Sequence, residues 1–339
     1  MVNAPTDIVI QVEDLHVHFD TYEGLVPAVN GVSFEMRRGR TTALVGESGC
    51  GKSVTSYAVL RLIQRPGRIA EGHIRYLPSD GEPLDITSLS EDDDVVYDLR
   101  GGKIGMVFQE PMTALSPVHT IGEQIAEGVR IHTGATPEEA LERAADILGR
   151  VGIPNVEQRV DQYSFEMSGG MRQRVVIAMA LACRPDVLIA DEPTTALDVT
   201  IQAQIMALLK DLQKDLGTSI LLITHDLGVV AQMADDVAVM YLGRILERAD
   251  VQTVMKSPRH PYTKGLLASL PGLSREHERL PSIDGVVPSP QEIPSGCPFH
   301  PRCPIAEPGV CDVGYPPDLV SIASAHEVAC LKAEDGLDG

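Results

Sequence analysis

The chain has 339 residues, of which 28 are Lys or Arg and 48 are Asp or Glu, so its formal net charge is −20. This acidic excess argues against binding to nucleic acid or to an anionic lipid surface, because both are held by clustered Lys and Arg. The longest uncharged apolar run, 175–183, is much shorter than the ~20 residues of a membrane span, and the first residues do not resemble a secretory signal. We therefore expect a cytosolic chain whose six cysteines are not disulfide-bonded.

Short apolar runs rich in β-branched residues predict buried strands that alternate with helices. The runs lack an in-out alternation, which is typical of a parallel sheet covered on both faces. The predicted strands are 41–46, 104–108, 187–190, 219–224 and 237–241. The predicted helices are 52–63, 137–151, 169–181 and 200–212. This order predicts an α/β fold class, with a core over about residues 8–250.

Three segments depart from this pattern. Residues 111–186 are helical in pattern without a good strand, which predicts a helical subdomain inserted into the core. The acidic run 91–94 lies in a polar stretch and is typical of a solvated surface insertion. Proline becomes frequent after Val251, so residues 251–339 are predicted to form a loop-rich extension.

The most specific local pattern follows the first predicted strand and precedes a helix. It fits G-x-x-x-x-G-K-[ST] and consists of Gly46, Glu47, Ser48, Gly49, Cys50, Gly51, Lys52 and Ser53, followed by Val54. Glycines let backbone N–H groups surround phosphates at the start of a helix. We expect Lys52 to contact the β- and γ-phosphates of a nucleotide and the Ser53 hydroxyl to coordinate Mg²⁺.

Two carboxylates, Asp191 and Glu192, follow the apolar strand 187–190. We expect Asp191 to reach the metal held by Ser53, directly or through water, and Glu192 to polarise a water molecule in line with the γ-phosphate. A strand that ends in Asp-Glu is common by itself. The interpretation therefore depends on the presence of the phosphate loop in the same chain.

A third pattern, residues 168–174, opens the helix between these two motifs. Ser168 predicts a helix N-cap, and Gly169 and Gly170 allow another group to approach the backbone closely. In isolation this segment is typical of an ordinary capped helix. In combination with the other two motifs it makes the sequence similar to the ATP-binding-cassette ATPases from about Val9 to Glu247.

The resemblance implies a P-loop core of cassette type with an amino-terminal antiparallel β subdomain. The family signature L-S-G-G-Q corresponds to residues 167–171, which keep the serine and both glycines but have Met at each end. The glutamine loop resembles Gln109, which would also reach Mg²⁺, and the switch histidine resembles His225. The D-loop resembles Ala196, Leu197 and Asp198, preceded by Thr195.

The family also stacks adenine on an aromatic side chain upstream of the phosphate loop. Phe19 fits this spacing and Tyr22 is the alternative, while a core aromatic remains the competing interpretation of either residue. In the family, two cassettes pack head to tail around ATP. The resemblance therefore implies that Ser168 serves the partner's nucleotide and that this chain, which carries one copy of each motif, must dimerise.

A narrower resemblance is to the peptide and nickel importers of bacteria. Its marks are the loop with Glu47 and the segments 109–117, 191–200 and 260–263. It implies an ATPase subunit that drives uptake of dipeptides or oligopeptides from the cytoplasmic face of the membrane. The implied partners are a paralogous second ATPase, two membrane-spanning permease subunits and an external peptide-binding protein. A cassette ATPase of DNA repair or translation is the alternative.

Four of the six cysteines, Cys297, Cys303, Cys311 and Cys330, lie in the proline-rich tail. Four thiols in a loop-rich cytosolic segment predict a metal site before disulfides. Their spacing, C-x5-C-x7-C-x18-C, is looser than that of structural zinc sites. The resemblance to peptide-importer ATPases favours a [4Fe–4S] cluster held by all four. Zinc, and free thiols or disulfides, are the alternatives.

Overall fold

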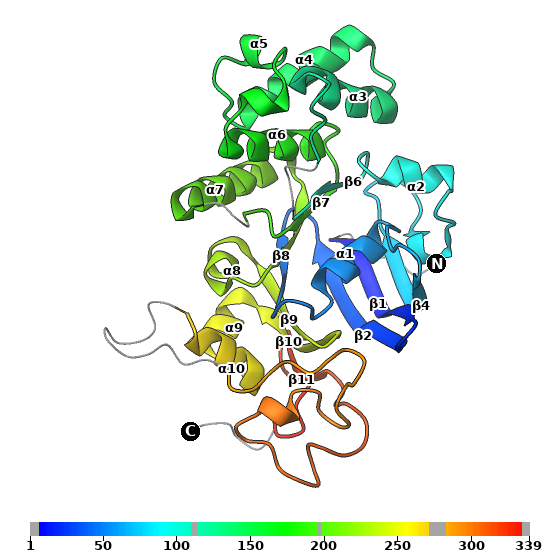
Figure 1. Cartoon of the computed structure of the whole chain (residues 1–339), viewed down its shortest axis with the longest axis vertical. Helices are drawn as coiled ribbons and strands as arrows, with labels where there is room; N and C mark the ends of the chain where they lie inside the picture. The colour runs from blue at the N-terminus through cyan, green and yellow to red at the C-terminus, as the bar shows by residue number, and fades with distance from the viewer. Residues whose placement is uncertain (1–6, 110–113, 195–197, 271–282, 334–339) are drawn as a thin grey trace. The chain divides into compact units, whose positions relative to one another are not determined.

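The computed structural model describes residues 7–109, 114–194, 198–270 and 283–333 (Figure 1). The chain forms two compact units. Unit 1 comprises Met1–Val9, Met36–Arg40 and Tyr76–Leu222, and unit 2 comprises Ile10–Glu35, Thr41–Arg75 and Ile223–Gly339. Neither unit is one continuous stretch of sequence, because the chain passes between them several times. The predicted boundary between residues 250 and 251 stays a prediction.

The parallel strands of unit 1 lie where the apolar runs predict them. β6 (Ile104–Val107) and β7 (Val187–Asp191) pair in parallel, with Val107 opposite Ala190. β8 (Ser219–Thr224), whose last two residues belong to unit 2, is the neighbour of β7. All residues of β7 and β8 are buried. A strand covered on both faces needs no polar side, which explains the uninterrupted apolar runs.

Helices follow β6 in unit 1, and the described residues 114–186 contain no strand. They are α3 (Ile121–Thr133), α4 (Pro137–Arg150), α5 (Val156–Arg159) and α6 (Gly169–Leu181). α3, α4 and α6 pack on one another (Figure 1). Thr120 with Glu123, and Thr136 with Glu139, form capping boxes that start α3 and α4. Residues 111–113 of the predicted helical segment lie outside the described residues.

The acidic run in unit 1 starts a helix. The Asp93 carboxylate accepts the backbone N–H of Val95 at 3.0 Å and caps α2 (Asp94–Leu99). Aspartate is favoured at this position because it satisfies an N–H group that has no partner within the helix. The unit also contains the two-residue strand β5 (Leu84–Asp85), the helix α7 (Val199–Leu216) and two short 3-10 helices, Ile86–Ser88 and Ser164–Glu166.

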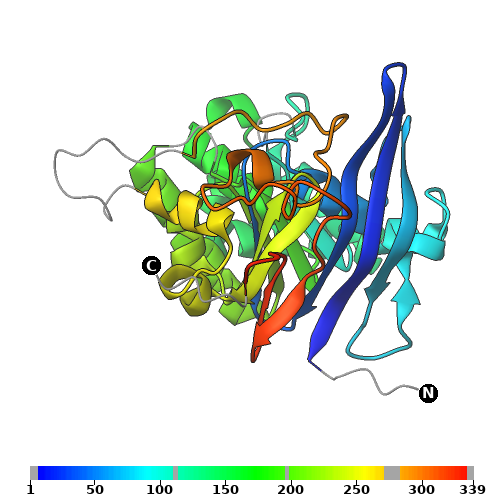
Figure 2. The ribbon, with the colours of Figure 1, turned by 90° about the horizontal axis from the view of Figure 1, so that it is seen from below.

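Unit 2 contains two groups of strands, apart from the strand-end residues 8–9, 36–37 and 76, which belong to unit 1. β1 (Ile8–Thr21), β2 (Gly24–Arg37) and β4 (Gly67–Tyr76) lie side by side in the order β2-β1-β4 (Figure 2), where an amino-terminal β subdomain was predicted. β3 (Thr41–Val45) pairs in parallel with β9 (Asp236–Tyr241). β10 (Arg244–Asp250) pairs antiparallel with β9, which makes this second sheet mixed. The unit also contains α1 (Lys52–Val59) and α8 (Leu227–Met233).

The tail is joined to this mixed sheet. After α9 (Val251–Lys256) and α10 (Pro261–Ala268), it forms two short strands, β11 (Val320–Ala323) and β12 (His326–Val328). β12 pairs antiparallel with β10, and β11 with β12 (Figure 2). The sequence pattern predicts a loop-rich extension here and does not indicate these strands. Among the described helices, none combines the length and apolar character that a membrane crossing requires.

Candidate functional site

The phosphate-loop pattern forms a tight turn between β3 and α1 in unit 2. Gly49 and Gly51 have φ angles of 79° and 102°, which residues with a side chain rarely adopt. A Cβ atom on Gly46 would lie 2.2 Å from the carbonyl oxygen of Met240, and one on Gly51 would lie 2.4 Å from that of Ala28. The backbone conformation therefore requires glycine at positions 49 and 51, and the available space requires it at positions 46 and 51. A loop whose backbone surrounds phosphates has the same requirements.

Lys52 folds back over this loop. Its Nζ donates to the carbonyl oxygens of Gly46 at 2.8 Å and Glu47 at 3.0 Å, and the residue is 5% exposed. Ser48 and Gly49 are exposed. The predicted loop residues Gly46, Ser48, Gly49, Cys50, Gly51, Lys52, Ser53 and Val54 thus lie together at the N-terminus of α1. An N-terminus of this kind favours an anion.

The two carboxylates lie at the end of β7 in unit 1. Asp191 is fully buried, and Glu192, the next residue, has a φ of 46°, an uncommon conformation for a residue with a side chain. The Nε2 of Gln109 donates to Oε2 of Glu192 at 3.1 Å. The structure thus brings two of the three predicted catalytic residues into contact. Strained backbone is concentrated at functional sites, and this makes Glu192 a candidate functional residue.

The signature segment opens α6 as predicted. The Ser168 hydroxyl accepts the backbone N–H of Met171 at 3.3 Å, which confirms the N-cap. Ser168 and Gly169 are exposed, and a Cβ atom on Gly169 would meet no atom of this chain within 4 Å. Farther along α6, the buried Gln173 donates from Nε2 to the carbonyl oxygen of Pro193 at 2.6 Å. Sequence patterns did not indicate this link to the loop that follows Glu192.

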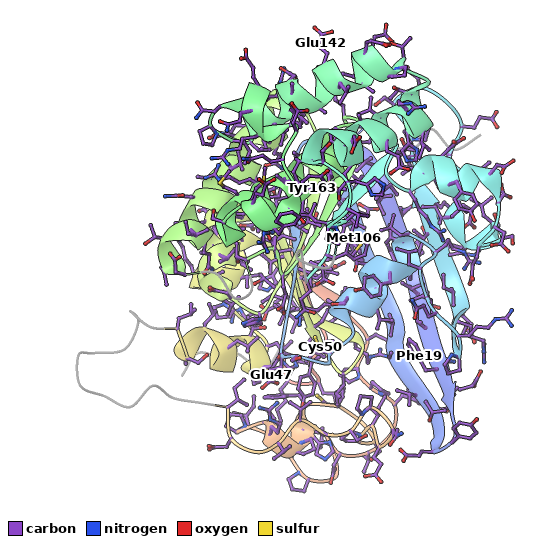
Figure 3. All side chains as sticks on the ribbon, turned by 45° about the horizontal axis from the view of Figure 1, so that its top comes forward. Phe19, Glu47, Cys50, Met106, Glu142 and Tyr163 are labelled. Carbon is purple, nitrogen blue, oxygen red and sulfur yellow. The ribbon has the colours of Figure 1, made fainter. Side chains whose placement is uncertain are left out.

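His225 and Phe19 lie in unit 2. His225 is exposed directly after β8, just before Asp226, which caps α8. Phe19 is half-buried on β1 (Figure 3), and a Cβ atom on Gly67 would lie 2.5 Å from its ring. Tyr22 is fully exposed. The ring of Phe19 therefore packs against this chain, whereas Tyr22 extends into solvent.

The nucleotide motifs are thus divided between the two units. The phosphate loop, Phe19 and His225 belong to unit 2, and Gln109, the two carboxylates and the signature belong to unit 1. Residues 110–113 of the glutamine-loop segment, and Thr195, Ala196 and Leu197 of the expected D-loop, lie outside the described residues.

All four tail cysteines line one cavity of about 20 Å³ in unit 2. These cysteines are Cys297, Cys303, Cys311 and Cys330. Burial, the largest cause, together with the other three thiols raises the pKa of Cys297 to about 11. All six cysteines of the chain are free of disulfides. Among the described residues, no three His, Cys, Asp or Glu side chains are arranged to hold a metal ion.

His260 lines the same cavity and is 1% exposed. Its Nδ1 accepts the backbone N–H of Tyr262 at 3.0 Å, so a neutral ring carries its proton on Nε2. Burial lowers the pKa of His260 to about 3, which keeps the ring neutral. Within the described part of the chain, Nε2 has no hydrogen-bond partner. A buried donor of this kind usually has an acceptor.

Comparison with protein-family models gives two matches. Residues 29–195 match the model of the ABC transporter family, and residues 246–311 match the model described as oligopeptide/dipeptide transporter, C-terminal region. The first match spans the phosphate loop and the carboxylates. The second spans three of the four tail cysteines.

Individual relatives and solved structures agree with these matches. The oligopeptide transport ATP-binding protein AppD of Bacillus subtilis is 48% identical, with 96% of this chain and 97% of that protein covered. The dipeptide transport ATP-binding protein DppD of the same organism is 48% identical, with 95% and 94% covered.

Among solved structures, the dimeric cassette MJ0796 in a post-hydrolysis state with ADP and phosphate matches with a TM-score of 0.62 at 27% identity. The match covers 71% of this chain and 98% of that one. CbiO1 of Clostridium perfringens, part of the cbiONQ transporter complex, matches with a TM-score of 0.62 at 30% identity, with 74% and 92% covered. Together with the phosphate loop and the carboxylates at the end of β7, these matches show that the chain belongs to the ATP-hydrolysing, ATP-binding proteins of the ABC transporter family.

Proposed function

We propose that the chain is the ATP-hydrolysing subunit of an importer of dipeptides or oligopeptides. The observation that carries this proposal is the match of residues 246–311 to the C-terminal region of oligopeptide/dipeptide transporters, in the same chain as the ABC match at residues 29–195. Relatives named for oligopeptide and dipeptide transport match over nearly their whole length. The alternative, a cassette ATPase of DNA repair or translation, has no support of this kind, and the net charge of −20 argues against nucleic acid.

For the nucleotide we propose that Lys52 and the loop N–H groups bind the phosphates. The Ser53 hydroxyl, the Asp191 carboxylate and the amide oxygen of Gln109 would hold Mg²⁺, a donor set of the oxygen type that this cation prefers. The contact with Glu192 uses the amide nitrogen of Gln109, so the assignment of its oxygen to the metal is compatible with that contact. When bound, Mg²⁺ neutralises charge on the phosphate oxygens.

We propose Glu192 as the general base that takes a proton from the attacking water, and His225 as the residue that orients the γ-phosphate. Phe19 remains the proposed adenine platform. Ser168, Gly169 and Gly170 are proposed to contact the nucleotide of a partner cassette. The exposure of Ser168 and the open space around Gly169 support this assignment, because packing within the chain does not require glycine there.

The proposed assembly contains a paralogous second ATPase and two membrane-spanning permease subunits, and it works with an external peptide-binding protein. The chain would then lie at the cytoplasmic face of the membrane without entering it. Within the fold, we propose that residues 111–186 form an inserted helical subdomain at which permeases dock. Gln109, at the start of this segment, would link the docking surface to the γ-phosphate.

An uptake experiment tests the importer proposal. Liposomes that contain the purified complex of this chain with its permeases are expected to accumulate a labelled dipeptide when ATP and the binding protein are present. A labelled sugar serves as the control substrate and is expected to stay outside. ATP hydrolysis without uptake of any dipeptide or oligopeptide would refute the assignment of the substrate while leaving the ATPase activity intact.

For the tail, we propose that the four cysteines hold a [4Fe–4S] cluster. The chemistry of the cavity supports a fit, since four thiols and the donor Nε2 of His260 line it together. Cysteine thiolates are the usual ligands of such clusters, and N–H donors to sulfur tune them. Because the thiols are not arranged to hold an ion in the present structure, we expect loading to draw them together. A bound cluster would tie down a segment with few apolar residues.

Metal analysis of the anaerobically purified protein tests the cluster. We expect about four iron atoms per chain, with acid-labile sulfide and a brown visible absorption. Cys303→Ser is expected to lose most of the iron, whereas the control Cys183→Ser, outside the cavity, retains it. Stoichiometric zinc without iron would show that the cysteines hold zinc rather than a cluster. The absence of both metals would show that the four thiols are free.

A further inference from the structure

The tail contacts the phosphate loop through an ion pair between Arg302 and Glu47. The Nη1 of Arg302 donates to Oε2 of Glu47 at 2.7 Å, and its Nη2 donates to Oε1 at 3.0 Å. Two parallel hydrogen bonds fix both the position and the direction of the carboxylate. The Arg302 side chain is only 4% exposed, so this pair differs from solvated surface pairs, which contribute little.

Arg302 is itself held in one place by the tail and by β9. Its Nε donates to the carbonyl oxygen of Asp284 at 3.2 Å. Its guanidinium carbon lies 5.8 Å from the centre of the Tyr241 ring and 6.0 Å from that of Phe299. The hydrogen bonds to Glu47 raise the pKa of Arg302 above its usual value, which keeps the guanidinium charged. Arg302 is therefore a fixed charge that directs two donors at the loop.

A second residue from beyond position 250 holds the backbone of Glu47. The N–H of Glu47 donates to the hydroxyl of Tyr262, in α10, at 2.9 Å, and Tyr262 is fully buried. The carbonyl oxygen of Glu47 in turn accepts Nζ of Lys52 at 3.0 Å. Figure 3 shows Glu47 beside Cys50 and close to the tail. The tail thus fixes the position of Glu47. The carbonyl oxygen of Glu47 in turn helps to fix the Lys52 side chain.

Charge gives the ion pair a second effect. A carboxylate in a loop that binds a triphosphate would repel it, and repulsion is strong in a partly buried site. Arg302 neutralises Glu47 at N–O distances of 2.7 and 3.0 Å. Without Arg302, the loop would be both less fixed and more negative.

From these contacts we propose that Arg302 and Tyr262 are positioning residues for the phosphate loop, so that the tail forms an outer layer of the nucleotide site. Both are proposed to act through Glu47, the loop residue that they contact, rather than by direct contact with the nucleotide. This inference rests on the proposed function only in taking residues 46–53 as the ATP-binding loop. It does not require a cluster at the cysteines.

The test measures ATP affinity and turnover of the complex that contains the full chain. Arg302→Gln is expected to raise Kd and KM for ATP about tenfold, because it leaves a partly buried carboxylate unpaired, while kcat stays within about twofold. Arg302→Lys is expected to give an intermediate Kd, since it keeps the charge but loses the paired hydrogen bonds. The double variant Glu47→Gln/Arg302→Gln is expected to bind ATP more tightly than Arg302→Gln alone.

The matched control is Arg248→Gln, which removes an ion pair between β10 and Glu327 of the tail with an Nε–Oε2 distance of 2.6 Å. It is expected to bind ATP like the parent. Equal affinities of Arg302→Gln and the parent, or equal losses in Arg302→Gln and Arg248→Gln, would overturn the proposal. A parent complex that binds no ATP would instead overturn the proposed function.

A milder variant keeps the test decisive if Arg302→Gln fails to fold or loses metal from the tail. Tyr262→Phe removes one hydroxyl from a buried ring and leaves the N–H of Glu47 without its acceptor. It is expected to raise Kd for ATP about threefold. An unchanged Kd in a folded Tyr262→Phe complex would refute the positioning role.

Discussion

Replacing Glu192 by glutamine is expected to lower ATP turnover by about 10²–10⁴-fold, the usual contribution of a positioned general base. ATP binding is expected to stay at the parental level, because the phosphate contacts are assigned to the loop 46–53. Glutamine has the shape of glutamate, and its amide oxygen can still accept the hydrogen bond from Gln109, whose Nε2 lies 3.1 Å from the carboxylate. What the variant loses is the capacity to take a proton.

Phosphate release measures the turnover, and a fluorescent ATP analogue measures the binding. Glu142→Gln makes the same chemical change at an exposed position of α4 (Figure 3) and is expected to hydrolyse ATP at the parental rate. Parental turnover in Glu192→Gln would remove Glu192 from the catalytic role. Loss of both binding and turnover would indicate that the Glu192 carboxylate supports the fold of the loop rather than the chemistry.

The sequence predicts the buried strands and α6 well because their signals are local. β7 is apolar up to its last residue, Asp191, and β8 is apolar between Ser219 and Thr224, so their bounds follow closely from composition. Ser168 and Leu181 limit α6 in the structure as in the prediction. For the site, the phosphate loop could be predicted because each glycine meets a backbone constraint that no other residue satisfies, as at Gly46 and Gly51.

The end of α1, and features that depend on distant residues, could not be predicted. Helix α1 ends at Val59, before the predicted end at residue 63, because Arg61 adopts a φ of 54°. The tail strand β12 forms because β10 offers it an edge, and nothing in residues 326–328 alone indicates this pairing. Glu47 and Arg302 are 255 positions apart, and each is by itself an ordinary charged residue. Only the folded chain shows that they form a pair.

Replacing Gly169 by aspartate is expected to abolish turnover in the complex while leaving the chain itself stable. A Cβ atom here meets nothing of the same chain within 4 Å, so the new side chain fits. An acidic group in the first turn of α6 interacts favourably with the helix dipole, by about 0.3–1 kcal/mol. Across the interface, however, the aspartate would oppose the phosphates of the partner's ATP by bulk and by charge. We expect a loss of turnover of about 100-fold or more, the usual effect of misplaced reacting groups.

Thermal unfolding and phosphate release separate the two effects. Gly128→Asp in α3 is the matched control, because a Cβ atom at Gly128 also meets nothing within 4 Å, and it is expected to keep parental turnover. If Gly169→Asp hydrolysed ATP normally, the signature would not contact a partner's nucleotide, and the reason for glycine at this exposed position would have to be sought elsewhere. If its unfolding temperature fell together with its activity, the glycine would instead serve the fold of α6. Loss of turnover at an unchanged unfolding temperature is the result expected if the signature contacts the nucleotide of a second cassette, because the chain by itself has room for the aspartate.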